Sequence, residues 1–282
     1  MGNLALERKH MLMTHTRIPI LALGLVLAAC DQPETSTESV EPATPPAAVS
    51  PVATVVEAAG VPAALAEALG TRSEADQARD AGRKPGEVVT FLGISSGMTV
   101  LDLFAAAGWY TEVLSHAVGP DGTVYAQNPE LLLRMRDGVN EKAVAARLAD
   151  GRLPNVERLD REISDLGLQP ESVDVAMFAL NFHDVYNRGG AEAAGGLLQS
   201  VYQVLKPGGI FALIDHDGTA ENDNAALHRI EKARVLEVIE SSPFTLEAES
   251  DVLSNPDDDM SAVVFDPEVR GHTNRFVLRL KK

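Results

Sequence analysis

The amino-acid sequence predicts an α/β fold with a doubly wound, mostly parallel sheet and a C-terminal antiparallel hairpin. From about residue 97 onward, short apolar segments alternate with helical patterns, which is typical of parallel strands covered by helices on both faces. The last two strand-like segments, 244–250 and 275–280, have no helical pattern between them. A hairpin with an unusually long connection is therefore expected at the C-terminal end.

Length, composition and charge restrict the function. The chain has 282 residues, of which 45% are hydrophobic, so it can bury one large core. Only 5% of the residues are aromatic, and the formal net charge is −17. A polyanion would be repelled by this charge, so the sequence argues against a nucleic-acid partner.

The N-terminal segment has the pattern of a bacterial lipoprotein signal peptide. Basic residues precede a mostly apolar run, 18–29, that is too short to span a bilayer. The motif LAAC at 27–30 resembles a lipobox, in which the cysteine becomes the acylated N-terminus. We therefore expect residues 1–29 to be a signal peptide and Cys30 to carry the lipid that anchors the protein, facing the periplasm, to a bacterial membrane. A cut elsewhere, with Cys30 removed or idle, is the alternative.

Two further segments follow the predicted signal peptide. Residues 30–57 are rich in Pro, Thr, Ser, Glu and Ala and have no apolar periodicity. Such a stretch cannot offset the entropy of ordering, so it is predicted to be a disordered tether. The folded domain is predicted over 58–282. It begins with a helix in which Pro62 suits the first turn and Gly70 the stop, and a polar helical segment follows over 71–94.

The strands and helices after residue 97 follow from their patterns. Each strand segment is apolar or alternating, and the helical segments carry apolar residues at spacings of three and four. Strands are predicted at 99–104, 123–127, 155–160, 172–180, 210–215, 244–250 and 275–280. Helices are predicted at 109–118, from Glu130 onward, at 191–205 and at 226–241, and the KPGG segment at 206–209 is expected to be a turn.

This order of elements resembles that of class I S-adenosylmethionine-dependent methyltransferases. The resemblance covers about residues 75–282, and segments such as GWYTEVL, LNFHD, LKPGG, LHRIE and TNRFVL resemble a bacterial group of predicted methyltransferases. It implies the Rossmann-like class I methyltransferase fold and S-adenosylmethionine as the cofactor. It also implies methyl transfer to a small-molecule acceptor.

In this family the first strand ends in an acid and leads into a glycine-rich turn that approaches the cofactor. The matching stretch here is DLFAAAG, in which Asp102 stands at the acid and Gly108 at the last glycine. Phe104 and Ala106 stand where glycines are usual. The methyl groups of Ala106 and Ala107 disfavour positive φ and are expected to fill space that the cofactor needs. A tight turn without a ligand is the alternative.

The resemblance implies three more cofactor-binding residues. Asn128 follows the second strand, where an acid usually binds the ribose hydroxyls, and Glu162 follows the third strand, where an acid commonly meets the adenine amino group. Asn181 follows the fourth strand, beside the cofactor pocket. A plain helix cap at Asn128 and an exposed loop acid at Glu162 are the alternatives.

Histidine and aspartate residues follow the fourth and fifth strands. His183 and Asp184 lie in LNFHD, and Asp215 and His216 lie in IDHD. Because parallel strands end at the same edge of a sheet, these groups are expected to lie close together. His183, Asp184 and His216 are therefore predicted as catalytic residues that remove a proton from the acceptor. A structural hydrogen bond from His183 is the alternative.

Two other functions fit the same residues. A membrane-tethered, non-catalytic module would bind another ligand in this pocket, because S-adenosylmethionine is not expected in quantity outside the cytoplasm. A metal-dependent enzyme would use nitrogen and oxygen ligands suited to zinc. The residues considered for that role are His183, Asp184, Asp215, His216 and His228. Their spacing matches no short metal motif, so no metal ligand is assigned.

Overall fold

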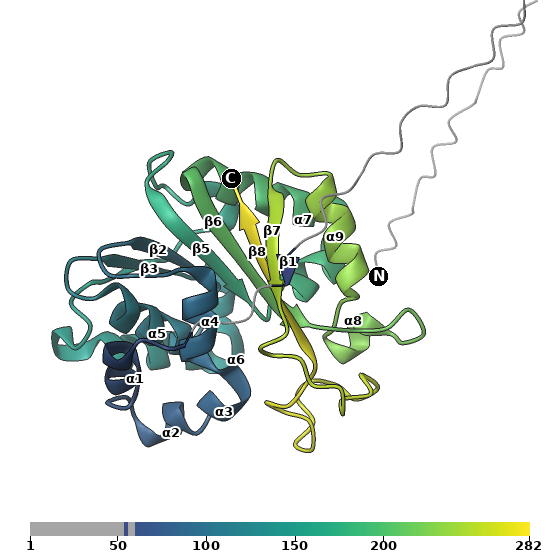
Figure 1. Cartoon of the computed structure of the whole chain (residues 1–282), viewed down its shortest axis with the longest axis horizontal. Coiled ribbons are helices and arrows are strands. Elements are labelled where there is room, and N and C mark those ends of the chain that lie inside the picture. The colour runs from purple at the N-terminus through teal and green to yellow at the C-terminus, as the bar shows by residue number, and fades with distance from the viewer. Residues whose placement is uncertain (1–53, 56–59) are drawn as a thin grey trace, which may run out of the picture. The chain divides into compact units, whose positions relative to one another are not determined.

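The computed structural model describes residues 54–55 and 60–282. Its centre is an eight-stranded sheet in the order β1-β7-β8-β6-β5-β2-β3-β4 (Figure 1). The strands are β1 (Thr54–Val55), β2 (Thr99–Leu103), β3 (Thr123–Gln127), β4 (Val156–Leu159), β5 (Val173–Ala179), β6 (Leu205–His216), β7 (Thr245–Ser250) and β8 (Arg275–Lys281). The predicted signal peptide and Cys30 lie outside the described residues.

The pairing of the strands confirms the predicted fold class. Every neighbouring pair in the sheet is parallel except the two that involve β8, which runs antiparallel to β6 and to β7. The order of the strands reverses between β5 and β2, because β3 and β4 extend the sheet on one side of this pair and β6 to β8 extend it on the other. Open α/β sheets bind ligands at this switch point, beyond the carboxyl ends of the strands.

Helices cover both faces of the sheet (Figure 1). The described helices are α1 (Ala63–Leu69), α2 (Glu74–Gln77), α3 (Asp80–Arg83), α4 (Pro85–Leu92), α5 (Trp109–Val118), α6 (Glu130–Leu148), α7 (Phe182–Val204), α8 (Asn224–Leu227) and α9 (Lys232–Glu240). Short 3-10 turns follow at Ala149–Gly151 and Ile163–Asp165. A hydrophobic core lies on each face of the sheet, and successive residues of a strand point into the two cores in turn, because side chains alternate across a sheet. Thus Met177 packs with α1, α4 and α5, whereas Phe178 packs with α7 and α9.

Three predicted elements differ in the structure. The KPGG segment is not a free turn, since β6 runs from Leu205 through it, and the pairing register with β5 shifts between Val173 and Val175. The predicted helix 226–241 is wrong as one element, because His228 has φ +56° and separates α8 from α9. Helix α7 begins at Phe182, but Gly190 with φ +65° interrupts it, and its second part begins at the predicted residue 191.

The ends of the domain also bear on the predictions. Thr54 and Val55 pair in parallel with Ala248 and Glu249 of β7, so the sheet begins within the segment assigned to the tether.

Among the described helices, none has the length and apolar character that a membrane crossing needs. The long connection between β7 and β8 contains no helix or strand, and part of it borders the cavity described next.

Candidate active site

A cavity of about 710 Å³ lies at the switch point of the sheet. Its walls come from the carboxyl ends of β2, β5 and β6, from α3 and the start of α5, and from the connection between β7 and β8. This volume falls within the range of small-molecule sites, about 300–1,000 Å³. Of the residues predicted for the site, the cavity brings together Asp102, Phe104, Ala106, Asn181, His183, Asp184 and His216.

The turn after β2 keeps a left-handed backbone without its usual glycines. Phe104 has φ +50° and Ala106 has φ +51°, in the region that glycine adopts most easily. The Phe104 ring packs edge-on against Phe178 at 5.2 Å between centroids, so it contributes to the core as well as to the cavity wall. Ala106 therefore adopts the disfavoured positive φ despite its Cβ, whereas Ala107 does not.

Side chains at the end of β3 hold this turn in place. The backbone N–H of Phe104 donates to Gln127 Oε1 at 3.0 Å, and that of Ala106 donates to Asn128 Oδ1 at 2.7 Å. Asn128 Nδ2 in turn donates to the carbonyl of Ala106 at 3.3 Å. These bonds to polar side chains offset the cost of the strained conformation, which is of order 1–2 kcal/mol for a residue with a Cβ.

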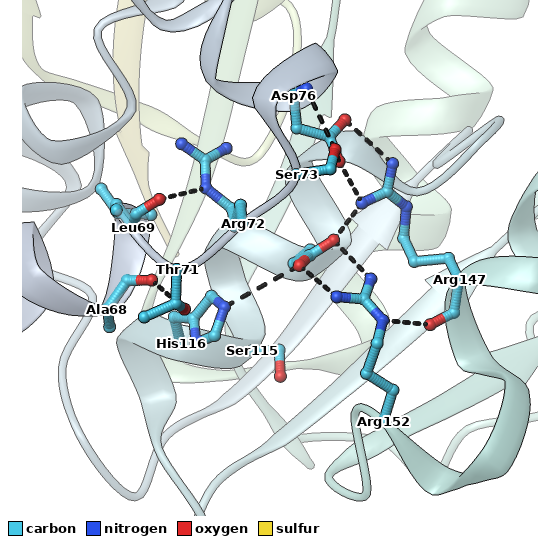
Figure 2. A network of polar contacts seen from close by, with 12 residues as sticks. Ala68, Leu69, Thr71, Arg72, Ser73, Asp76, Ser115, His116, Arg147 and Arg152 are labelled. Atoms are coloured by element: carbon cyan, nitrogen blue, oxygen red, sulfur yellow. Dashed lines mark hydrogen bonds and ion pairs between the residues drawn. The ribbon is translucent and has the colours of Figure 1, made fainter.

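A partly buried ion network supports the same turn from α6. Arg147 Nε donates to the carbonyl of Ala107 at 2.9 Å, and its two terminal nitrogens bind the carboxylate of Asp76 at 3.0 Å each (Figure 2). Arg147 also binds Glu112, a buried residue of α5 that Arg152 binds at 2.6 and 2.7 Å. A Cβ on Gly108 would meet Arg147 Cδ at 3.0 Å, so glycine makes room for this arginine.

Asp102 is a buried carboxylate in the cavity wall. It accepts a hydrogen bond from Thr111 Oγ1 at 2.6 Å, and no described cation pairs with it. Burial raises the pKa of Asp102 to about 7, although the bond from Thr111 and the charge of Arg83 act in the opposite direction. Such an unpaired buried acid is suited to a cationic ligand group.

Three predicted cofactor residues lie elsewhere. Asn128 is buried, and both atoms of its amide bind Ala106, so its side chain positions the turn. Pro129, rather than Asn128, is the N-cap of α6. Glu162 is exposed at the start of a 3-10 turn, and Gly108 caps α5; neither is among the residues that line the cavity.

The histidines and aspartates after β5 and β6 form a connected group. His183 Nδ1 lies 2.7 Å from Asp215 Oδ1, and its backbone N–H donates to Asp215 Oδ2 at 2.7 Å. His216 Nδ1 lies 2.7 Å from Thr273 Oγ1, and the two histidine rings are 6.0 Å apart between centroids. Asp184 Oδ2 is 3.8 Å from His183 Nε2.

The two histidines have opposite pKa shifts. Burial lowers the pKa of His183, but the Asp215 carboxylate more than offsets this, so the net pKa lies above its usual range. Burial and the positive charges of His183 and Arg275 hold the pKa of His216 well below its usual range. A pair whose surroundings separate the two pKa values is typical of acid–base sites.

Only part of the predicted metal-ligand set lies close together. One ligand atom each from His183, Asp184 and His228 lie within 4.8 Å of one another, so an N,N,O set exists at the cavity edge. Asp215 instead binds His183, and His216 binds Thr273. No metal is assigned to this site.

The residues that support the turn from α6 could not be found from sequence. Arg147 lies 71 positions from Asp76 and 35 from Glu112, and no motif joins them. Asp215, by contrast, was visible as a candidate beside His216, but its pairing with His183 required the sheet register.

Comparisons with known proteins agree with this geometry. A family model described as a methyltransferase domain matches residues 94–243. The arsenite methyltransferase of Halobacterium salinarum is 32% identical over 143 residues, which cover 50% of this chain and 33% of that protein. The matched part therefore spans about a third of the length of that curated relative.

Solved structures show the same fold. A SAM dependent methyltransferase from Aquifex aeolicus has a TM-score of 0.51 and 21% identity, over 72% of this chain and 97% of that one. An arsenic (III) S-adenosylmethionine methyltransferase from Chlamydomonas reinhardtii has a TM-score of 0.50 and 16% identity, over 79% and 74% of the two chains. Because the family model matches more than half of the 282 residues, this chain belongs to the methyltransferase domain family, and its domain is a class I S-adenosylmethionine-dependent methyltransferase domain.

Proposed function

We propose that the protein transfers a methyl group from S-adenosylmethionine to a small-molecule acceptor in the cavity. The observation that carries this proposal is the left-handed backbone at Phe104 and Ala106. It keeps the path of a glycine turn along the cavity wall even though both residues carry a Cβ. The proposal also draws on family membership and on the position of the cavity at the switch point of the sheet.

The residues around the turn fit the cofactor's amino-acid part. The Asp102 carboxylate would hold its ammonium group, because a buried acid without a cationic partner gains most from a positive ligand. The backbone N–H of Ala107, which has no acceptor among the described residues, is a further donor at this wall. When bound, the cofactor supplies a methyl group on an already activated sulfonium.

The histidine–aspartate pair would prepare the acceptor. The Asp215 carboxylate would accept a hydrogen bond from Nδ1–H of His183, which leaves Nε2 free to take a proton from an acceptor hydroxyl or amine. Asp184, near Nε2, would stabilise the positive ring that results. His216 stays neutral at ordinary pH and is a second hydrogen-bond partner for the acceptor.

Arsenite is not the acceptor that we propose, although the relative in Halobacterium salinarum is an arsenite methyltransferase. Trivalent arsenic is a soft centre that prefers thiolate ligands, as soft metals do. The chain has one cysteine, Cys30, and it lies in the segment assigned to lipidation. An oxygen or nitrogen nucleophile suits the histidine–aspartate pair better.

We also propose that Cys30 anchors the protein to a bacterial membrane. The support is the LAAC motif at 27–30 behind an apolar run. Metabolic labelling with an alkyne fatty acid should mark the wild-type protein but not a Cys30→Ser variant. Equal labelling of both would contradict this part of the proposal.

Isothermal titration with S-adenosylhomocysteine tests the enzyme proposal directly. We expect one site per chain, and then incorporation of tritium from methyl-labelled S-adenosylmethionine into a small-molecule extract. No heat at millimolar ligand would contradict the proposal. Titrating the Asp102→Asn variant in parallel separates binding at the turn from nonspecific heat.

A further inference from the structure

Four arginines line the cavity. Arg79 precedes α3 as its N-cap, and Arg83 is the last residue of that helix. Arg270 lies near the end of the connection that leads into β8, and Arg275 is the first residue of β8. We call these four residues the arginine cluster. They face only two acidic residues in the cavity wall, Asp102 and Asp184, so cations outnumber anions there, although the chain as a whole carries a charge of −17.

The cluster has no acidic partner among the described residues. Arg275 is buried, and it donates to the backbone carbonyls of Thr273 at 3.1 Å and Gly271 at 3.3 Å instead of a carboxylate. Arg83 lies over the ring of Trp109 at 4.8 Å, and Arg79 lies over the same ring at 5.4 Å. These cation–π contacts hold the side chains in place and leave their N–H donors available.

Other buried arginines of the domain are neutralised. Arg229 is fully buried and binds Asp258 through both terminal nitrogens at 2.8 and 3.1 Å. Arg72, also buried, pairs with Asp80. The arginine cluster differs from these paired arginines, because it brings several positive charges together without a carboxylate. Such an arrangement costs free energy, and an anion bound among the arginines would offset that cost.

The cluster lies next to the predicted acid–base group. Arg275 pairs with His216 across the antiparallel ladder of β6 and β8, and His216 in turn lies beside His183. An anion held by Arg275 and Arg270 would therefore place the rest of its molecule near these histidines. Arginine suits this task because its planar fork binds carboxylate or phosphate in a bidentate manner.

We propose that the arginine cluster binds a carboxylate or phosphate group of the methyl acceptor, so that the acceptor is an anionic small molecule. This inference rests on the proposed function and names its substrate class. One arginine can bind the carboxylate of the cofactor in a bidentate manner, so four arginines exceed what the cofactor alone requires. The cofactor's net positive charge adds to that of the cavity, so its binding increases the attraction for a second, anionic ligand.

Titration calorimetry on the full-length protein, saturated with S-adenosylhomocysteine, tests this inference. Citrate and inorganic phosphate are the probes, and at least one of them should bind to the loaded protein with a millimolar or lower dissociation constant. S-adenosylhomocysteine must be saturating, because its own carboxylate then already occupies the cofactor's position and an added anion has to bind elsewhere in the cavity. If S-adenosylhomocysteine binds but neither anion does, the inference fails while the proposed function stands. If S-adenosylhomocysteine does not bind, the proposed function fails first.

Variants then assign the binding to the cluster. Arg270→Gln and Arg79→Gln change exposed side chains, so the fold should be retained. Each is expected to weaken anion binding about tenfold, the usual loss for one charged hydrogen bond. The matched control is Arg134→Gln, an exposed arginine that pairs with Glu130 outside the cavity. Equal affinity in all variants, or an equal loss in the control, would overturn the inference.

Discussion

At the scale of single residues, Ala106 holds a left-handed backbone conformation in the turn after β2. An alanine with φ +51° is strained by about 1 kcal/mol relative to glycine. Ala106→Gly should therefore raise the free energy of unfolding by up to about 1 kcal/mol and leave the affinity for S-adenosylhomocysteine equal or higher. Chemical denaturation and calorimetry measure both quantities.

The control for this substitution is the neighbouring alanine at 105, whose φ is not positive. Ala105→Gly gains no strain relief and increases the entropy of the unfolded chain, so it should lower stability. If Ala106→Gly were as destabilising as Ala105→Gly, the turn would not adopt the left-handed path in solution.

Asp102 links cofactor binding to pH. Its pKa of about 7 means that the folded protein holds this proton up to neutral pH, whereas the unfolded chain releases it near 4. The folded state binds more protons in that window, so the contribution of Asp102 to stability falls as pH rises from about 4 to 7. The ammonium group of S-adenosylhomocysteine favours the ionised form of Asp102, so this ligand should bind more tightly at pH 8 than at pH 6.

Asp102→Asn should separate stability from binding. At pH 8 the variant avoids a buried charge and should be more stable by on the order of 1–3 kcal/mol. It should bind S-adenosylhomocysteine at least about tenfold more weakly and without the pH dependence. Thermal melts and calorimetry at both pH values check this, and an unchanged affinity would remove Asp102 from the cofactor site.

His183 is expected to act as the base through its bond to Asp215. His183→Gln should lower kcat about 10²–10⁴-fold with little change in S-adenosylhomocysteine affinity. Asp215→Asn removes the charge that raises the pKa of His183, so the acidic limb of the kcat/KM profile should move to lower pH. His272→Gln changes an exposed histidine at the cavity and serves as the control. An acidic limb that does not move would assign Asp215 a structural role only.

At the scale of the elements, local patterns predicted most strands and helices. TVYAQ and WYTEVLSHAV became β3 and α5 with the predicted bounds, because their periodicity and flanking glycines agree with the tertiary structure. The KPGG segment lies inside β6, but it has no partner in β5, because the pairing passes from Val173–Leu205 directly to Val175–Ile210. The break at His228 has no glycine or proline to indicate it.

The same contrast holds for the site. Asp102, His183 and His216 were predictable, since each follows a strand whose carboxyl end must reach the switch point. The supports from Arg147 and Asn128 were not, because these residues lie 40 and 22 positions away from the turn residues that they bind. Such contacts depend on how α6 and α2 pack, and sequence periodicity carries no information on that.

Glu112 is the charge that joins α5 to the end of α6. Burial alone would raise the pKa of Glu112, but its bonds to Arg152 and Arg147 more than offset this, so the pKa lies below its usual range. Glu112→Gln leaves two arginines without this partner and should lower the free energy of unfolding by about 2–3 kcal/mol at pH 7. The matched control is Glu141→Gln in the exposed pair with Arg158, which should change stability much less.

Acidification provides a second test of the same network. A carboxyl group whose pKa is lower in the folded than in the unfolded protein stabilises the fold at pH values above its unfolded-state pKa. This stabilisation is lost as the pH falls through the folded-state pKa. The difference in stability between wild type and Glu112→Gln should therefore shrink below about pH 4. Urea titrations at pH 7 and pH 3.5 measure it, and a pH-independent difference would mean that packing, not charge, makes the contribution.

At the scale of the whole molecule, the core and cavity residues that the structure describes all follow residue 60. Only β1 precedes residue 60 among the described elements, and it adds two residues to the edge strand β7. A chain that begins at residue 60 should therefore fold cooperatively and bind S-adenosylhomocysteine with the wild-type affinity. It should also be recovered free of membranes, because it lacks the predicted lipid anchor at Cys30.

Calorimetry and membrane fractionation, each beside the full-length protein, check these two outcomes separately. A Cys30→Ser variant of full length is the control, since it removes the proposed lipid but keeps β1 and the preceding residues. If the shortened chain lost cofactor affinity while Cys30→Ser kept it, the segment before residue 60 would be part of the binding domain rather than a tether. If the Cys30→Ser variant stayed with the membranes, the anchor would lie elsewhere.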